Sequence, residues 1–218
     1  LYSGMDFMRV SCPNILRIDA SMRLEGSISR LLADITISNL SKNLPDASVI
    51  SRDLRLGVGH VSSLWREASI ESPSSRSPED RAILAQSEAM VEEVNRADII
   101  VMAVPIYNFC IPAALKAWVD MICRNNVDGA SASFKPQPIQ TKQALIILTS
   151  NHTLAGSKDD FASNFLHHIL SFIGCSEIHQ IDATGLADNK ANVLASAHQK
   201  VQSICQAVVS QELSTAAE

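Results

Sequence analysis

"DIIVMAVPIYNFCIP", residues 98–112, contains the transition that decides the fold. Its first half is a continuous apolar run, which is typical of a strand covered on both faces of a sheet. Its second half places two aromatic residues and an asparagine between two prolines, and a helical pattern follows from Ala113. A buried strand that leads through a short loop into a helix is the repeating unit of a parallel α/β sheet.

The same alternation of strand and helix recurs along the chain. Strands are expected at 14–21, 47–54, 98–104, 143–150 and 176–184. Helices are expected from Ser29 onward, at 77–96, from Pro112 to about Cys123, at 159–173 and at 188–209. Long loops are expected at 55–77 and 125–140. The pattern predicts an α/β fold, a doubly wound five-stranded parallel sheet with helices on both faces.

The length of 218 residues suits one domain, which is expected to span 14–210. Residues 1–13 are expected to be an extension that is disordered or derives from cloning, and 211–218 a polar C-terminal tail. The formal net charge is −5 and the basic residues form no cluster, which disfavours nucleic acid as a partner. No apolar run reaches the ~20 residues that a membrane-spanning helix needs.

The cysteine pattern bears on the cellular compartment. The chain has five cysteines, widely spaced and without a CxxC pair. This favours reduced thiols in a cytoplasmic protein over a disulfide framework or a zinc site. Because the charge pattern disfavours nucleic acid, a small molecule is the expected kind of partner.

Ligands of open α/β sheets bind beyond the carboxyl ends of the strands, so three loops are informative. The loop after the first strand, "SMRLEGSISR", holds Ser21, Arg23, Ser27 and Ser29 and runs into a helix N-terminus. Hydroxyl groups and the positive end of a helix dipole suit a terminal monophosphate. The alternative is that Ser27 or Ser29 is an ordinary helix cap and that Arg23 is a solvated loop residue.

The loop after the third strand holds Tyr107, Asn108 and Phe109. Two rings and an amide at the carboxyl end of a strand suit a flat heteroaromatic ligand. The alternative is a hydrophobic staple, in which Ile106 or Phe109 packs under the following helix. The loop after the fourth strand, "SNHTLAGS", contains His152, which is the one histidine expected at this edge of the sheet.

Several common sites are not supported by the sequence. No GxGxxG follows the first strand and no GxxxxGK[ST] occurs, which disfavours a dinucleotide site of the Rossmann type and a P-loop. No GxSxG or HExxH occurs either, which disfavours a serine hydrolase elbow and a zinc protease helix. No side chain is assigned as catalytic.

Three segments together resemble one known family. They are "SMRLEGSIS" at 21–29, which fits the pattern S-x-R-x-x-x-S-x-S, "PIYNFCIP" at 105–112, which fits P-[MI]-Y-N-F-x-I-P, and "LKAWVD" at 115–120. With these segments the chain is similar to the FMN-dependent NADH:quinone oxidoreductase and azoreductase family, whose fold is flavodoxin-like. The likeness extends more weakly from about Ile15 to Gly185.

The resemblance implies where FMN binds. The first loop would hold the phosphate, and the loop after the third strand would line the isoalloxazine and ribityl groups. The expected cofactor-binding residues are Ser21, Arg23, Ser27, Ile28, Ser29, Pro105, Ile106, Tyr107, Asn108, Phe109, Ser150, Asn151, His152 and Thr153. The segment Ser150–Thr153 departs from the family, in which many members carry S-R-G-G, because Asn151 and His152 replace an arginine and a glycine. This departure bears on flavin orientation, redox potential and substrate range.

The resemblance also implies the activity. NADH or NADPH would reduce the bound FMN, and a quinone or azo compound would then take two electrons in a ping-pong reaction. Members are homodimers with the active site at the subunit interface, so the loops 55–77 and 125–140 would provide cover and partner contacts. Two alternatives stay open: a flavodoxin-like one-electron carrier, and a family member that has lost flavin and acts as a binding protein.

Overall fold

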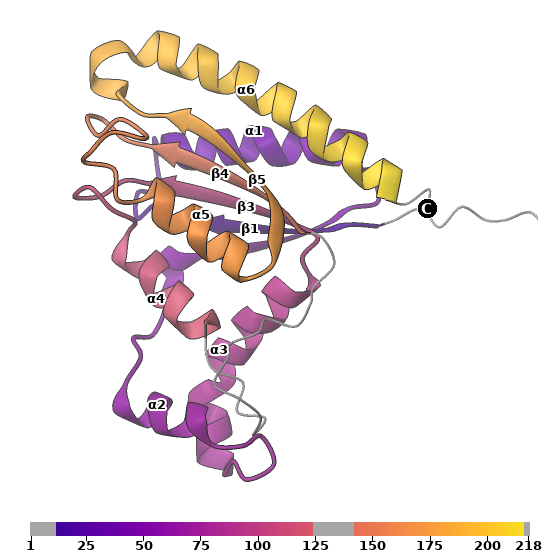
Figure 1. Ribbon diagram of the computed structural model, residues 1–218, viewed down its shortest axis with the longest axis vertical. Helices are drawn as coiled ribbons and strands as arrows, with labels where there is room; N and C mark the ends of the chain where they lie inside the picture. The colour runs from indigo at the N-terminus through magenta and orange to yellow at the C-terminus, as the bar shows by residue number, and fades with distance from the viewer. Residues whose placement is uncertain (1–11, 124–141, 216–218) are drawn as a thin grey trace, which may run out of the picture.

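The computed structural model describes residues 12–123 and 142–215. In this part of the chain all five strands lie in one parallel sheet with the order β2-β1-β3-β4-β5 (Figure 1). The strands are β1 (Asn14–Asp19), β2 (Ser48–Asp53), β3 (Ile99–Pro105), β4 (Lys142–Thr149) and β5 (Cys175–Ala183). The predicted doubly wound parallel sheet is confirmed.

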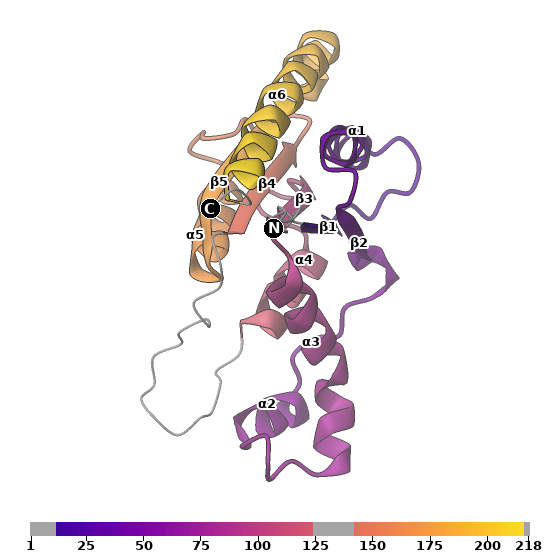
Figure 2. The same cartoon turned by 90° about the vertical axis from the view of Figure 1, so that its right-hand side faces the viewer.

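Helices cover both faces of the sheet (Figure 2). One face is covered by α1 (Ile28–Asn43) and α6 (Leu186–Thr215). The other face is covered by α3 (Pro78–Arg96), α4 (Ala113–Ile122) and α5 (Ser163–Phe172). The remaining helix, α2 (Ser63–Ile70), packs on α3 away from the sheet.

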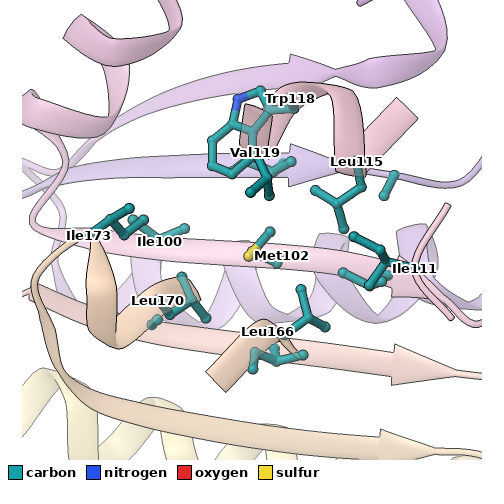
Figure 3. Close-up of a cluster of buried hydrophobic side chains, with 14 of the residues drawn as sticks. Ile100, Met102, Ile111, Leu115, Trp118, Val119, Leu166, Leu170 and Ile173 are labelled. Carbon is teal, nitrogen blue, oxygen red and sulfur yellow. The ribbon is translucent and has the colours of Figure 1, made fainter. Parts of the chain in front are cut away.

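The central strand β3 is buried along its whole length, as its apolar run predicts. Alternate side chains point to opposite faces of a strand. Ile100 and Met102 accordingly belong to the cluster beneath α4 and α5, whereas Ile99 and Val101 belong to the cluster beneath α1 and α6. Figure 3 shows Ile100 and Met102 among side chains of α4 and α5, including the fully buried Trp118.

Most helix boundaries follow from local chemistry. Ser77 caps α3 by accepting from the backbone N–H of Asp80, the Asp80 carboxylate accepts from the N–H of Ser77, and Pro78 follows the cap. This predicted start is confirmed. Helix α6 begins at Leu186 and reaches Thr215, so it is longer than the expected 188–209, with a non-helical residue at Asn189.

The expectation of a long loop at 55–77 is wrong. A short 3₁₀ helix (Leu54–Leu56) and α2 occupy much of it. Ser62 caps α2 by accepting from the N–H of Trp65 at 3.1 Å, and Trp65 and Ala68 pack against Leu84 of α3. An eight-residue helix shows too little periodicity to be recognised without its packing partner. The expected loop at 125–140 lies outside the described residues.

The start of α5 also differs from its expected position at residue 159. The helix begins at Ser163, because the carboxylate of Asp160 accepts hydrogen bonds from the N–H groups of Ala162 and Ser163 and ends the preceding loop. Among the helices of the described chain, none is long and apolar enough to cross a membrane.

Replacement of Trp65 tests the separate packing of α2 on α3. Trp65→Ala should cost about 3 kcal/mol of local stability, because it removes most of a small cluster that does not include the sheet. Amide hydrogen exchange should therefore rise in 62–70 and stay slow in β3. The matched control is Leu64→Ala on the same helix, where the side chain is exposed and no change is expected. Equal acceleration in β3 would contradict a local effect.

Candidate functional site

A pocket of about 390 Å³ lies at the carboxyl edge of the sheet. The strand registers place Asp19, Pro105 and Thr149, the last residues of β1, β3 and β4, at the same edge. The strand order changes direction between β1 and β3, which is the switch point where ligands of open α/β sheets bind. The pocket lies where the sheet topology predicts a ligand.

The structure brings all the expected site residues together. Every residue named for the three loops lines the pocket: Ser21, Arg23, Ser27, Ile28, Ser29, Pro105, Ile106, Tyr107, Asn108, Phe109, Ser150, Asn151, His152 and Thr153. Three further residues were missed, namely Gly26, Thr149 and Leu186. Leu186 follows β5, and applying the carboxyl-end rule to that strand would have indicated it.

The first wall of the pocket is the N-terminus of α1. Ser27 is the N-cap and its hydroxyl accepts weakly from the N–H of Arg30 at 3.5 Å. The hydroxyls of Ser27 and Ser29 lie 3.2 Å apart, and both residues are buried although they line the pocket. Ser27 is therefore the ordinary cap that the alternative describes, and it still faces the space in which an anion would lie. Arg23 is exposed, and no ion pair to its guanidinium occurs within 12–123 and 142–215.

Ion pairs and hydrogen bonds of Arg30 hold this wall in place. The guanidinium of Arg30 donates to the carbonyl of Ser21 and to the carboxylate of Asp53, each at 2.7 Å. A second nitrogen of Arg30 lies 3.4 Å from the buried carboxylate of Asp19. Burial alone would raise the pKa of Asp53, but hydrogen bonds from Arg30 and Arg55 outweigh it and hold the pKa below its ordinary value. Arg30 is thus balanced by carboxylates, and it fixes the loop by its hydrogen bond to Ser21.

The second wall is a tight turn after β3. The backbone N–H of Tyr107 donates to the carbonyl of Cys110 at 2.9 Å, and the N–H of Cys110 donates back at 3.1 Å. Inside this turn Asn108 has a φ of 48° and Phe109 a φ of 73°. In the described part of the chain they are the only non-glycine residues with positive φ. Asn tolerates this region, whereas a bulky residue such as Phe does so only at a cost in strain.

The two rings of this turn are not packed under α4. Tyr107 is 39% exposed and Phe109 is 54% exposed, and both line the pocket. Ile106 and Ile111 instead belong to the core cluster that includes Leu115 of α4. The staple alternative is therefore wrong for Phe109, whereas Ile106 is buried in the same core cluster as residues of α4.

The third wall is the segment Ser150–Thr153. Its backbone is held by α6, because the N–H of Leu186 donates to the carbonyl of Ser150 and the N–H of Ala187 donates to that of Asn151, both at 3.1 Å. The side chains of Asn151 and His152 are exposed. None of these residues has a positive φ, so this loop adopts its shape without the conformational freedom of glycine.

The lining of the pocket limits its chemistry. Within the described residues no carboxylate or thiol lines it, and no group of His, Cys, Asp and Glu side chains is arranged to hold a metal ion. Its polar groups are hydroxyls, amides, one arginine and one histidine. The arrangement suits binding and orientation of a ligand with an anionic end and a flat aromatic end.

Comparisons with known proteins identify the family and the fold of the chain. A family model described as a flavodoxin-like fold matches residues 13–207. The chain is 38% identical over 192 residues to the FMN-dependent NADH:quinone oxidoreductase 1 of Colwellia psychrerythraea, covering 88% of this chain and 100% of that protein. It is 38% identical over 170 residues to the FMN-dependent NADH:quinone oxidoreductase of Thiobacillus denitrificans, covering 78% of this chain and 83% of that protein.

Solved structures show the same fold. An FMN-dependent NADH-azoreductase of Bacillus anthracis, in complex with FMN, has a TM-score of 0.74 at 17% identity, covering 90% of this chain and 99% of that one. The azoreductase AzrA has a TM-score of 0.76 at 18% identity, covering 88% and 98%. The expected flavodoxin-like fold and the expected family are confirmed.

Acid titration tests the ionic network. Asp53→Asn should cost about 2 kcal/mol at pH 7, because it removes the charged acceptor of two arginines. The pKa of Asp53 is lower in the folded than in the unfolded chain, so this contribution is complete above the ordinary value of 3.8 and is lost as the pH falls through the folded-state pKa. Urea unfolding should show the two proteins converging below about pH 4. The exposed Asp46→Asn is the control, and a difference that persists undiminished to pH 3 would refute the assignment.

Substitution of Phe109 tests the strained turn. Glycine adopts a φ of 73° without strain and alanine does not, so Phe109→Gly should be about 1 kcal/mol more stable to unfolding than Phe109→Ala. Phe161, which is also exposed but has no positive φ, is the matched position. There the alanine variant should be at least as stable as the glycine variant. The same order at both positions would mean that Phe109 is not strained.

Proposed function

The chain belongs to the flavodoxin-like family of FMN-dependent NADH:quinone oxidoreductases, and from this we propose that it transfers two electrons from NADH or NADPH through bound FMN to quinones and azo compounds. One observation carries the proposal. A single pocket at the switch point joins the N-terminus of α1 and its buried serines to the exposed rings of Tyr107 and Phe109. FMN has a phosphate at one end and a flat heteroaromatic ring at the other, so each end meets a matching wall.

The first wall fits a phosphate on local grounds. Ser29 is 1% exposed, and within residues 12–123 and 142–215 its hydroxyl shares a hydrogen bond only with that of Ser27. The first N–H groups of a helix have no intrahelical acceptor, which leaves those of Ile28 and Ser29 for the ligand. Gly26 has a φ of 66° with open space around it, so the loop leaves room at this end.

The residues of the chain then have distinct parts in the reaction. Ser27, Ile28 and Ser29 would bind the phosphate, and Arg23 would add a positive charge at the rim. Tyr107 and Phe109 would hold the ring and exclude water from it, and Asn108 would donate to or accept from its polar edge. When bound, FMN supplies the group that accepts a hydride and passes on two electrons. No side chain of the pocket has to form a covalent bond.

The proposal includes a ping-pong order and a homodimer in the cytoplasm. Donor and acceptor would enter the same side of the pocket in turn. Leu24 and Leu154 are exposed and adjacent in the sequence to pocket-lining residues, and the exposed Phe161 is hydrogen-bonded through its N–H to Phe109. These apolar side chains suit coverage by a second copy of the chain. The thiols of Cys110 and Cys205 fit a reducing compartment. Sedimentation at micromolar concentration should give a species of twice the 23.6 kDa chain mass.

The activity is tested with the purified protein, FMN and NADH. The protein should become yellow with FMN, lose this colour under anaerobic NADH or NADPH, and regain it on addition of a quinone. Steady NADH oxidation with a quinone and no partner protein separates the enzyme from a one-electron carrier. A protein that binds FMN but is bleached by neither nucleotide would refute the proposed reaction, and failure to bind FMN would favour a binding protein without flavin.

The phosphate site is tested by Ser29→Ala. Loss of one hydroxyl donor to a charged phosphate should raise the Kd for FMN about tenfold. The Kd for riboflavin, which lacks the phosphate, should not change, and fluorescence titration of both flavins measures this. Ser38→Ala, an exposed position farther along α1, is the control and should bind both flavins as the wild type does. An equal loss of affinity for both flavins would place the phosphate elsewhere.

A further inference from the structure

The strained turn at Asn108 and Phe109 is held from outside as well as from within. The carbonyl of Phe109 accepts a hydrogen bond from the backbone N–H of Phe161 at 3.0 Å. Phe161 lies in the loop between β4 and α5, far away in the sequence, so this contact ties the second wall of the pocket to a separate segment. Residues in sparsely populated conformations persist only when their surroundings hold them there.

The side chain of Phe161 does not explain its position. Its ring is 63% exposed, so packing contributes little to the placement of its backbone. The neighbouring Asp160, in contrast, is 7% exposed. The backbone position of Phe161 is therefore set by the neighbouring residues of the chain.

The carboxylate of Asp160 accepts hydrogen bonds from donors on both sides of Phe161 in the chain. It accepts from the N–H of Gly156 at 2.8 Å, from the N–H groups of Ala162 and Ser163 at 2.9 and 3.0 Å, and from the hydroxyl of Ser163 at 2.5 Å. Burial alone would raise the pKa of Asp160, but these hydrogen bonds outweigh it and hold the pKa below its ordinary value. The carboxylate is thus charged at neutral pH, and its hydrogen bonds link the two ends of the loop 156–163.

This loop is itself anchored to the sheet. The N–H of Ala155 donates to the hydroxyl of Thr184, directly after β5, at 3.1 Å. At its other end Ser163 begins α5, whose Leu166 and Leu170 are buried in the core. A fixed loop therefore presents one backbone donor, that of Phe161, to the carbonyl of the strained residue.

We propose that Asp160 is a positioning residue for the aromatic wall of the pocket: it holds the Phe161 N–H against the Phe109 carbonyl and so keeps the left-handed turn in place. The consequence for the flavin ring rests on the proposed function. Asp160 does not line the pocket and acts only through Phe161 and Phe109. A role confined to capping α5 would instead affect stability without affecting the turn.

The test compares Asp160→Asn with Asp159→Asn, its exposed neighbour. Asparagine keeps the shape, but its NH₂ group cannot accept from Gly156, so the loop loses part of its closure. In the protein without flavin, hydrogen exchange of the segment 104–112 should become at least tenfold faster in Asp160→Asn and stay unchanged in Asp159→Asn. In the protein with FMN, Asp160→Asn should raise the Kd about tenfold and alter the visible circular dichroism of the flavin.

Two further variants keep the test decisive. Phe161→Ala removes the ring and keeps the N–H, so it should leave exchange in 104–112 unchanged. Ser163→Ala removes one donor to Asp160, so it should speed exchange in 104–112 as Asp160→Asn does, but by less. It replaces Asp160→Asn in the test if Asp160→Asn does not fold. The proposal is overturned if Asp160→Asn and Ser163→Ala lower the melting temperature while exchange in 104–112 stays at the wild-type rate. Failure of the wild type to bind FMN would refute the function and leave the exchange result valid.

Discussion

Burial of β3 on both faces is the constraint on which the rest of the structure depends. Every residue of this strand is buried, and only its last residue, Pro105, lines the pocket. The side chains become exposed after the strand ends, from Tyr107 onward. Since β1 and β4 flank β3 in register, their ends reach the same edge, and three loops converge on one pocket. Packing of the core therefore determines where a ligand can bind.

The charged groups beneath this edge of the sheet are also largely committed to structure. Arg30, in the first turn of α1, is engaged by Asp19 and Asp53. Breaking such a partly buried set of ion pairs destabilises the fold by more than the set stabilises it relative to apolar side chains. The cation of Arg30 is thus largely neutralised and serves to fix the loop. Attraction for an anion would come from the helix dipole, the N–H groups, the serine hydroxyls and the exposed Arg23. A chain with net charge −5 could bind a phosphate in this way, as the proposed function requires.

Much of this was predictable because the decisive signals are local. The apolar run of β3 predicts a doubly buried strand, and the serine loop and the turn after β3 predict the pocket walls. The features that were missed depend on tertiary contacts. Trp65 reveals α2 only when Leu84 of α3 is beside it, and Asp160 reads as an early helix residue until its four donors are seen.

The departure at Asn151 and His152 has a similar explanation. Where many members of the family carry glycines, the backbone of this chain has no positive φ, and it is held by the N-terminus of α6. Left-handed geometry occurs instead at Asn108 and Phe109, which the sequence does not indicate because Phe rarely adopts it. Among the non-glycine residues that line the pocket, left-handed backbone conformations thus occur in the loop after β3.

The energy balance at Phe109 gives a reason for a ring at such a position. A non-glycine residue in this region costs about 1 kcal/mol or more, and glycine would avoid the cost. A phenylalanine side chain presents roughly 200 Å² of surface, of which 54% is exposed here, so covering it contributes about 2–3 kcal/mol at ~25 cal/mol per Å². The strain is offset only when something lies against the ring. The turn is therefore a local conformation that a bound aromatic ligand would stabilise, and its proposed support by Phe161 and Asp160 would then matter for binding.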